Sequence, residues 1–266
     1  MNAGRDMDRL LDRSAFPGPA LDARTAGVSF VGETRFNGCI ACTHWPRAAL
    51  QGLLPPGLAL AANVSATPDV HPVIFIFGEQ LEGTILFGGM SIPLGVHYSE
   101  FGLAIPYVVH RDGRSLHTYV PRMYSSFFPP VRDGNVHYGF GKALAALAWH
   151  GCIATLTAPD GGLLWHAAVE PAGPWSRSAR HAPPNLAALR AALALPILGR
   201  KHNGRYVRSY FDLGFADAQT RPLRCAISID AALIEGLTPQ RCYAVPDGAF
   251  EVRGMVWHLS WPEPLG

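Results

Sequence analysis

The stretch that decides the fold is Tyr98-Ser99-Glu100-Phe101-Gly102-Leu103-Ala104-Ile105-Pro106, in which one carboxylate stands among apolar and aromatic residues. We predict that it forms a strand. On the edge of a sheet, Glu100 would face water, as most glutamates do. Buried inside the protein, the same carboxylate would orient a substrate or steer a proton.

A second stretch, Gly139-Phe140-Gly141-Lys142-Ala143-Leu144-Ala145, places a lysine in apolar surroundings. Of the 22 Lys and Arg residues, only Lys142 and Lys201 are lysines. An ammonium buried in hydrocarbon loses basicity, and a neutral amine condenses with a ketone to form a Schiff base. The alternative is that the composition simply favours arginine and that Lys142 opens a helix and extends its charge to water.

Length and composition narrow the class of protein. With 266 residues and 48% hydrophobic content, the chain can form one large domain or two small ones. The net charge of +2, with arginines scattered singly, argues against binding to nucleic acid or to an acidic membrane surface. We find no signal peptide and no apolar run near the roughly 20 residues of a membrane span. The five cysteines are therefore expected to be reduced thiols in the cytoplasm.

Frequent glycine (28) and proline (23) predict a sheet-rich fold with many turns. We expect an N-terminal arm over residues 1–27 and one α+β domain over residues 28–266, mostly antiparallel, with a few short helices. The strands are expected at residues 28–31, 35–43, 73–77, 83–90, 95–98, 103–110, 116–123, 153–157, 163–169, 206–213, 226–229 and 250–261. The helices are expected at residues 46–54, 142–149 and 186–193.

Other motifs give weaker signals. The spacing of Cys39-Ile40-Ala41-Cys42 is that of a redox pair, but residues three apart in a strand point to opposite faces. The eleven histidines include no pair at tight ligand spacing on one predicted helix. No glycine motif for phosphate and no Gly-x-Ser-x-Gly elbow is present. We therefore predict neither a metal nor a cofactor.

Arg35 has two interpretations as well. It follows a turn and begins an apolar strand. At the surface it would be an ordinary solvated arginine. Pointing into a pocket, its guanidinium would hold a substrate carboxylate by two parallel, charge-assisted hydrogen bonds.

Three stretches together resemble the acetoacetate decarboxylase family. Residues 45–58, with Trp45-Pro46-Arg47-Ala48-Ala49-Leu50 and Leu54-Pro55-Pro56-Gly57-Leu58, resemble an early helix of that family and the turn after it. The Glu100 strand is the most specific match, and the Lys142 segment is the third. They occur in the family's order and at similar spacing, and the strand at residues 250–261 also fits. The resemblance extends loosely from about residue 28 to the C-terminus.

The resemblance implies an antiparallel β-barrel-like core with peripheral helices, assembled into a homo-oligomer. By position, Lys142 matches the Schiff-base lysine and Glu100 the active-site glutamate. Arg35 matches the carboxylate-binding arginine once one residue is inserted. The implied reaction is decarboxylation of a β-keto acid. The alternatives are an aldolase-dehydratase or other imine chemistry on a 2-oxo acid, and a non-catalytic protein that binds a small molecule.

The chain departs from the family pattern around the expected pocket. Ala143 replaces the family's second lysine, Gly141 replaces a proline, and the family's Gly-Arg-Glu segment upstream is absent. These changes indicate a larger or more aromatic substrate than acetoacetate. The candidate pocket walls, each of which could instead be ordinary core packing, are Tyr98, Phe101, Tyr124, Tyr138 and Phe140.

Overall fold

A computed structural model describes residues 28–62, 64, 69–88, 90–111, 115–177, 189, 191–215 and 217–265. The expected N-terminal arm (residues 1–27) lies outside the described residues, as do half of the helix expected at 186–193 and the tip of the turn at 112–114. Strands dominate the described part and the helices are short, so the α+β prediction is confirmed. No helix in the described ranges is long and apolar enough to cross a membrane.

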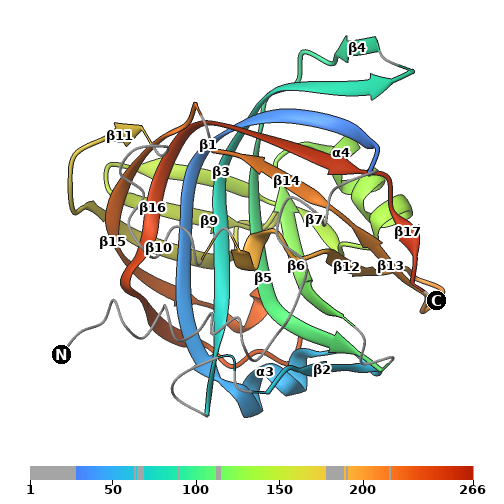
Figure 1. Ribbon diagram of the computed structural model, residues 1–266. Helices are drawn as coiled ribbons and strands as arrows, with labels where there is room; N and C mark the ends of the chain where they lie inside the picture. The colour runs from blue at the N-terminus through green and yellow to red at the C-terminus, as the bar shows by residue number, and fades with distance from the viewer. Residues whose placement is uncertain are drawn as a thin grey trace.

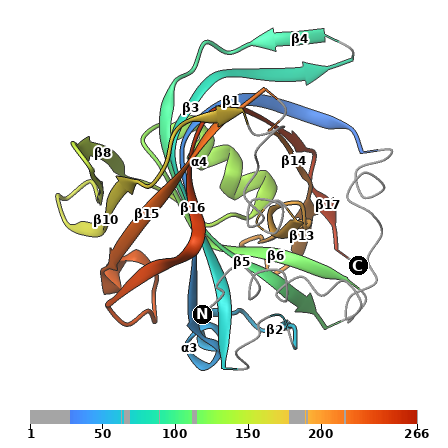
Figure 2. The ribbon, with the colours of Figure 1, turned by 60° about the vertical axis from the view of Figure 1, so that its left-hand side comes forward.

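The framework is a large, strongly curved sheet (Figure 1). Its central strands lie in the order β16-β1-β3-β5-β6, and each pairs antiparallel with its neighbour. They are β1 (Phe30–Pro46), β3 (Val70–Phe87), β5 (Tyr98–His110), β6 (Leu116–Ser125) and β16 (Gln240–Ser260). The sheet curls around α4 (Phe128–Asp133) without closing into a complete barrel (Figure 2).

Shorter elements complete the framework. The strands at its margins are β2 (Leu58–Leu60), β4 (Met90–Pro93), β7 (Lys142–Leu144), β11 (Ser176–Arg177), β12 (Ile197–Arg200), β13 (Tyr206–Ser209), β14 (Phe211–Gly214) and β17 (Glu263–Pro264). A smaller antiparallel sheet contains β8 (Ala146–His150), β9 (Ile153–Thr157), β10 (Leu163–Pro171) and β15 (Gln219–Ile229). The remaining helices are α3 (Arg47–Leu53), the π-helical turn η1 (Gly134–Tyr138) and the 3₁₀ turn η2 (Ala231–Leu233).

Alternation along β5 separates two cores. Phe101, Leu103 and Ile105 point outward from the curl and pack with Trp165 of the smaller sheet. Ala104 points into the curl and joins a second core. Because successive side chains of a strand face opposite ways, one strand serves both cores and leaves Glu100 on the inner face with Ala104.

The same alternation of side chains determines which face of β1 each cysteine of the Cys39–Cys42 motif occupies. Cys39 belongs to the outer core and Cys42 to the inner one, so their side chains lie on opposite faces of β1. Burial raises the pKa of the Cys42 thiol to about 12, which keeps it protonated and unreactive. As expected for residues three apart in one strand, the two thiols do not face each other.

Two expectations about local structure are corrected. Residues 28–46 do not form two strands, because β1 runs without interruption from Phe30 to Pro46 and bends at bulges. Residues 142–149 are not a helix, because β7 pairs with β6 and β8 pairs with β9. The expected helix at 46–54 is confirmed as α3, which ends before Pro55.

Candidate active site

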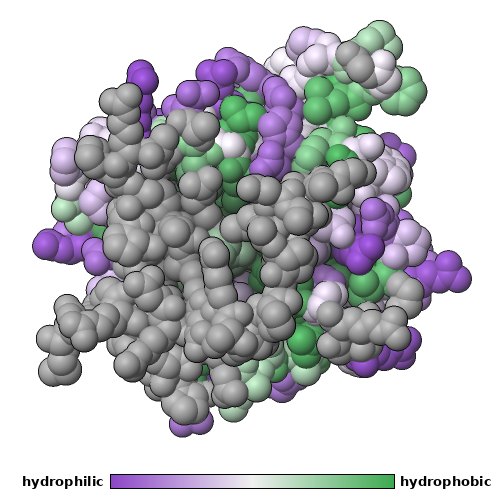
Figure 3. Space-filling view, in the orientation of Figure 1, coloured by the Kyte–Doolittle hydropathy of each residue, from purple (hydrophilic) through white to green (hydrophobic). Residues whose placement is uncertain are grey.

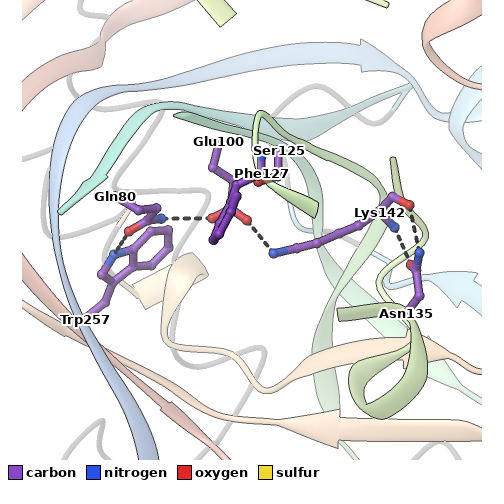
Figure 4. A network of polar contacts seen from close by, with 7 residues as sticks. All are labelled: Gln80, Glu100, Ser125, Phe127, Asn135, Lys142 and Trp257. Atoms are coloured by element: carbon purple, nitrogen blue, oxygen red, sulfur yellow. Dashed lines mark hydrogen bonds and ion pairs between the residues drawn. The ribbon is translucent and has the colours of Figure 1, made fainter. Parts of the chain in front are cut away.

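Lys142 and Glu100 meet inside the curl. The Nζ atom of Lys142 donates to Oε1 of Glu100, and the two side chains are only 9% and 8% exposed. The residues come from β7 and β5, 42 positions apart in the chain. Figure 4 shows the lysine stem extended toward the carboxylate. Lys142 and Glu100 therefore form a buried ion pair.

Strand β7 brings Lys142 to this position. It pairs parallel with β6, with Met123 opposite Lys142. The Asn135 side chain hydrogen-bonds both backbone groups of Lys142. Its Oδ1 accepts from the Lys142 N–H (2.6 Å), and its Nδ2 donates to the Lys142 carbonyl (2.8 Å). The backbone groups of Lys142 are therefore satisfied in an extended conformation, which overrides the helix propensity of residues 142–149.

Glycines shape the approach to β7. Gly139 (φ 67°) and Gly141 (φ 58°) adopt left-handed backbone conformations that end η1 and redirect the chain. Gly134 is needed for a different reason. A Cβ atom at this position would lie 2.7 Å from Cδ of Lys142, so the missing side chain makes room for the lysine stem.

A relay of hydrogen bonds holds Glu100. Nε2 of Gln80 donates to Oε2 of Glu100 (2.9 Å), and Nε1 of Trp257 donates to Oε1 of Gln80 (2.8 Å) (Figure 4). An indole nitrogen only donates, so the orientation of the buried Gln80 amide is fixed. Oε2 of Glu100 is thus an acceptor, and any proton on this carboxyl group belongs on Oε1, which faces the lysine.

Sequence reasoning missed Gln80 and Trp257. Gln80 is 1% exposed and lies on β3, which continues from the apolar run at 73–77. The signal available in the sequence was a polar residue shortly after an apolar run expected to be buried on both faces, which indicates a buried polar side chain. Nothing in the sequence pairs it with Trp257, which lies 177 residues away.

Two spaces that share lining residues adjoin the pair. The outer cavity, which opens to solvent, contains about 1300 Å³ of empty volume including its mouth and is lined by Lys142 and Glu100. The inner chamber, about 620 Å³ on the same basis, lies deeper and is lined by Glu100 but not by Lys142. The residues that line both spaces are Gln80, Glu100, Met123, Phe140, Phe211 and Trp257.

Three of the five expected wall residues line these spaces. Tyr98 and Tyr138 border the outer cavity, and Phe140 borders both. Burial raises the pKa of the Tyr98 phenol, and the carboxylates of Glu100 and Asp133 raise it further. Tyr98 therefore remains a neutral hydroxyl at the edge of the site.

Phe101 and Tyr124 do not line either space, which corrects the prediction for both. Phe101 follows Glu100 directly and so points outward, where it packs 5.0 Å from the ring of Trp165. Tyr124 is opposite Phe101 on β6 and donates its hydroxyl to the carbonyl of Leu233 (2.7 Å). Both side chains stabilise the outer core.

Arg35 also lies away from the site. Its side chain is 52% exposed, and Nε is 3.5 Å from Oε2 of Glu82. Its neighbours Thr34 and Phe36 line the outer cavity and the inner chamber, respectively. Arg35 stands between two inward-facing residues and therefore faces outward, so it is not placed to hold a substrate carboxylate here.

The charge of the outer cavity is mainly negative. Glu33, Glu100 and Asp133 line it, and among the described residues Lys142 is its only Lys or Arg. Oε2 of Glu33 is 3.0 Å from Nε2 of His258. The second lysine, Lys201, lies in the turn between β12 and β13 and lines neither space. Within the described ranges, no three His, Cys, Asp or Glu side chains gather as a metal site.

No protein-family model and no curated protein matches this sequence. Solved structures do match, and they define an acetoacetate decarboxylase-like fold, as the three motifs predicted. The enduracididine biosynthesis enzyme MppR, complexed with the condensation product of pyruvate and imidazole 4-carboxaldehyde, matches with a TM-score of 0.59 and 14% identity over 88% of each chain.

Two further structures carry the family name. Acetoacetate decarboxylase from Legionella pneumophila matches with a TM-score of 0.55 and 15% identity, over 90% of this chain and 89% of that one. An acetoacetate decarboxylase-like enzyme from Sphingomonas wittichii RW1 matches with a TM-score of 0.55 and 14% identity, over 90% and 94%. At such identities the likeness concerns the fold.

Proposed function

We propose that the protein is a lyase that forms a Schiff base between Lys142 and a β-keto acid and releases CO₂. The observation that carries this proposal is the buried contact between Nζ of Lys142 and Oε1 of Glu100 beside a cavity open to solvent. Such a pair offers a nucleophile and a proton acceptor in one place.

The first steps use both residues. The Lys142 ammonium passes a proton to Oε1 of Glu100, and the neutral amine attacks the ketone carbon. The resulting carbinolamine loses water and becomes a protonated imine. Glu100 is suited to the transfer because Gln80 already donates to its other oxygen, which leaves Oε1 directed at the amine.

Carbon–carbon cleavage then follows. The electrons of the bond to the carboxylate move into the protonated imine as CO₂ leaves, which gives an enamine. Protonation of the enamine carbon restores the imine, and water hydrolyses it to release the ketone and free Lys142. The negative outer cavity favours this direction, because the Glu33 and Asp133 carboxylates oppose a substrate carboxylate but not neutral CO₂.

A second function uses the same imine. An aldolase-dehydratase would remove a proton from the imine of a 2-oxo acid, add the enamine to an aldehyde and expel water. The specific observation in favour is that MppR, which has a similar fold, was captured with pyruvate and with a pyruvate–aldehyde condensation product.

Borohydride trapping tests the proposal. We expect reduction in the presence of acetoacetate to leave an adduct on the Lys142 peptide, visible by mass spectrometry, and CO₂ to be released without reductant. Lys142→Arg should abolish both, and Lys201→Arg should change neither. Pyruvate and an aldehyde giving a new ultraviolet absorbance without CO₂ release would favour the second function. Ligand-induced thermal stabilisation with no adduct would indicate a binding protein.

A further inference from the structure

We propose that the substrate of this site carries an apolar alkyl or aryl arm, which fills the inner chamber while its carbonyl carbon meets Lys142. The inference rests on the proposed Schiff-base function and adds the class of substrate. Three features of the chamber carry it: its position behind Glu100, the satisfied state of its polar groups and the small residues that make its space.

The chamber lies directly beyond the reacting pair. Lys142 and Glu100 both line the outer cavity, but only Glu100 lines the chamber as well. Met123, Phe140 and Phe211 border both spaces, so an arm can pass between them without leaving apolar surroundings. A ketone held at Lys142 therefore has one substituent directed toward the chamber and the other toward the outer cavity.

The chamber offers only apolar contacts. Its few polar lining residues already have partners: Gln80 bonds to Glu100 and Trp257, and Oγ1 of Thr118 donates to the carbonyl of Ala192 (3.1 Å). A charged or hydroxylated arm would lose its hydration and gain no hydrogen bond, which costs free energy. An alkyl or aryl arm gains instead, by about fourfold in affinity for each buried methylene group.

The space exists because two residues of β5 are small. Gly102 and Ala104 follow Glu100 on the inner face, and both line the chamber. A Cβ atom at Gly102 would meet only the Met123 side chain, at 3.7 Å, which is an ordinary contact. Its φ is not in the left-handed region, so neither crowding nor backbone conformation requires glycine there. The absent side chain leaves room beneath the carboxylate.

A homologous series of methyl ketones tests the inference. Acetone, 2-pentanone, 2-heptanone and 4-phenyl-2-butanone would each be titrated against borohydride trapping on the Lys142 peptide. We expect the half-saturating concentration to fall about fourfold for each added methylene until the chamber is full, the factor that ~0.8 kcal/mol gives. Acetone should be trapped weakly but at the same residue.

Two variants of the chamber provide the second measurement. Ala104→Leu fills the space, so it should remove the dependence of trapping on chain length. Gly102→Ala is the milder change and should reduce the gain from long chains only in part. Ala168→Leu makes the same exchange as the first variant at an exposed position of β10 and should behave as the parent.

The outcomes separate the two proposals. If no ketone, acetone included, is trapped on Lys142, the Schiff-base function itself is wrong. If all ketones are trapped at similar concentrations, or if both chamber variants keep the parental dependence on chain length, the proposal of an apolar arm is wrong. The Schiff-base function is then still supported. A dependence that the chamber variants weaken in the order of their size supports the inference.

Discussion

Nε1 of Trp257 lies 2.8 Å from Oε1 of Gln80, although 177 residues separate the two positions. This contact decides which end of a buried amide faces Glu100. With the indole as donor, Gln80 turns its NH₂ group to the carboxylate, and Glu100 keeps Oε1 free for Lys142. The contact between Glu100 and Lys142 is thus oriented by a tryptophan that bonds to neither of them.

The first prediction removes that tryptophan donor. Trp257→Phe keeps an aromatic ring against Phe36 and Phe211 but leaves the Gln80 carbonyl without its partner. We expect the unfolding free energy to fall by about 1–3 kcal/mol. Imine trapping on Lys142 should slow by about tenfold, and its pH profile should shift, because the amide is free to rotate.

Trp261→Phe is the matched control, since Trp261 also borders the outer cavity but is 55% exposed and makes no bond to Gln80. Trapping rates and pH profiles would be compared for the two variants. Equal effects would mean that Trp257 acts only through packing.

The second prediction concerns Glu100→Gln. The variant keeps the shape of the side chain, but once Gln80 donates to its carbonyl oxygen, its NH₂ group faces the Lys142 ammonium. Two donors then oppose each other, and no base accepts the lysine proton. We expect trapping to slow by about 10²-fold or more, the usual range for loss of a general base.

Glu33→Gln serves as its control, because Glu33 lines the same cavity and pairs with His258 rather than with Lys142. Single-turnover trapping of acetoacetate would measure both. A Glu100→Gln rate within threefold of the parent would remove Glu100 from the proposed mechanism.

Local patterns in the sequence singled out Glu100 and Lys142, and the resemblance to the acetoacetate decarboxylase family placed both in one site. Glu100 stands alone in an apolar strand, and Lys142 is one of two lysines in the chain. The strand assignment of β5 followed from the same pattern. Apolar surroundings in sequence therefore indicated burial correctly for both charges.

Other parts of the site depend on register and distant contacts, which local patterns do not contain. Phe101 was expected in the pocket wall, yet its direct neighbour Glu100 occupies the inner face and places it outside. Arg35 likewise lies between the inward-facing Thr34 and Phe36. Its side chain therefore faces outward and does not reach the cavity as expected. Helix formers after Lys142 favoured a helix, but Asn135 and β6 pair with the extended backbone.

A third prediction tests how η1 positions the lysine. Gly134 has helical backbone angles (φ −56°, ψ −38°), so alanine suits its conformation and should stabilise the turn by up to about 1 kcal/mol. The new Cβ would nevertheless lie 2.7 Å from Cδ of Lys142, a flexible stem that has to move. We expect Gly134→Ala to keep or raise the melting temperature while trapping slows at least tenfold.

Thermal unfolding and trapping would be measured on the same preparation. Gly52→Ala in α3 is the control, since no atom lies within 4 Å of a Cβ there. A Gly134→Ala protein that traps at the parental rate would show that the lysine stem has room to spare.

A fourth prediction concerns the projecting hairpin of β3 and β4. Its exposed apolar side chains are Ile85, Phe87, Met90, Ile92 and Leu94. They gather where the hairpin extends from the molecule, at the upper right of Figure 3. Isolated hairpins with exposed apolar surface are marginal in water. The resemblance implied a homo-oligomer, and we expect copies of this chain to associate through this hairpin.

Light scattering coupled to gel filtration would measure the assembly. Phe87→Glu with Ile92→Glu should reduce the mass to that of a smaller species, whereas Leu163→Glu, at an exposed site on β10, should not. A parental protein that runs as a monomer would contradict the prediction.

The last prediction is a pH dependence of stability set by His71, far from the lysine. His71 is fully buried between Nη1 of Arg47 (3.3 Å from Nδ1) and the Pro106 carbonyl (2.7 Å from Nε2). Burial, helped by the Arg47 charge, lowers the pKa of His71 from 6.5 to about 4. The folded protein therefore keeps this imidazole neutral where the unfolded chain binds a proton.

Because the unfolded state binds more protons between pH 6.5 and 4, stability should be complete above this window and fall as the pH drops through it. The shift corresponds to about 3 kcal/mol at the acid end. Urea unfolding at pH 7.5 and 4.5 would measure the loss, and His71→Gln, which does not titrate, should show a smaller one. Equal losses in the two proteins would assign the acid sensitivity to other groups.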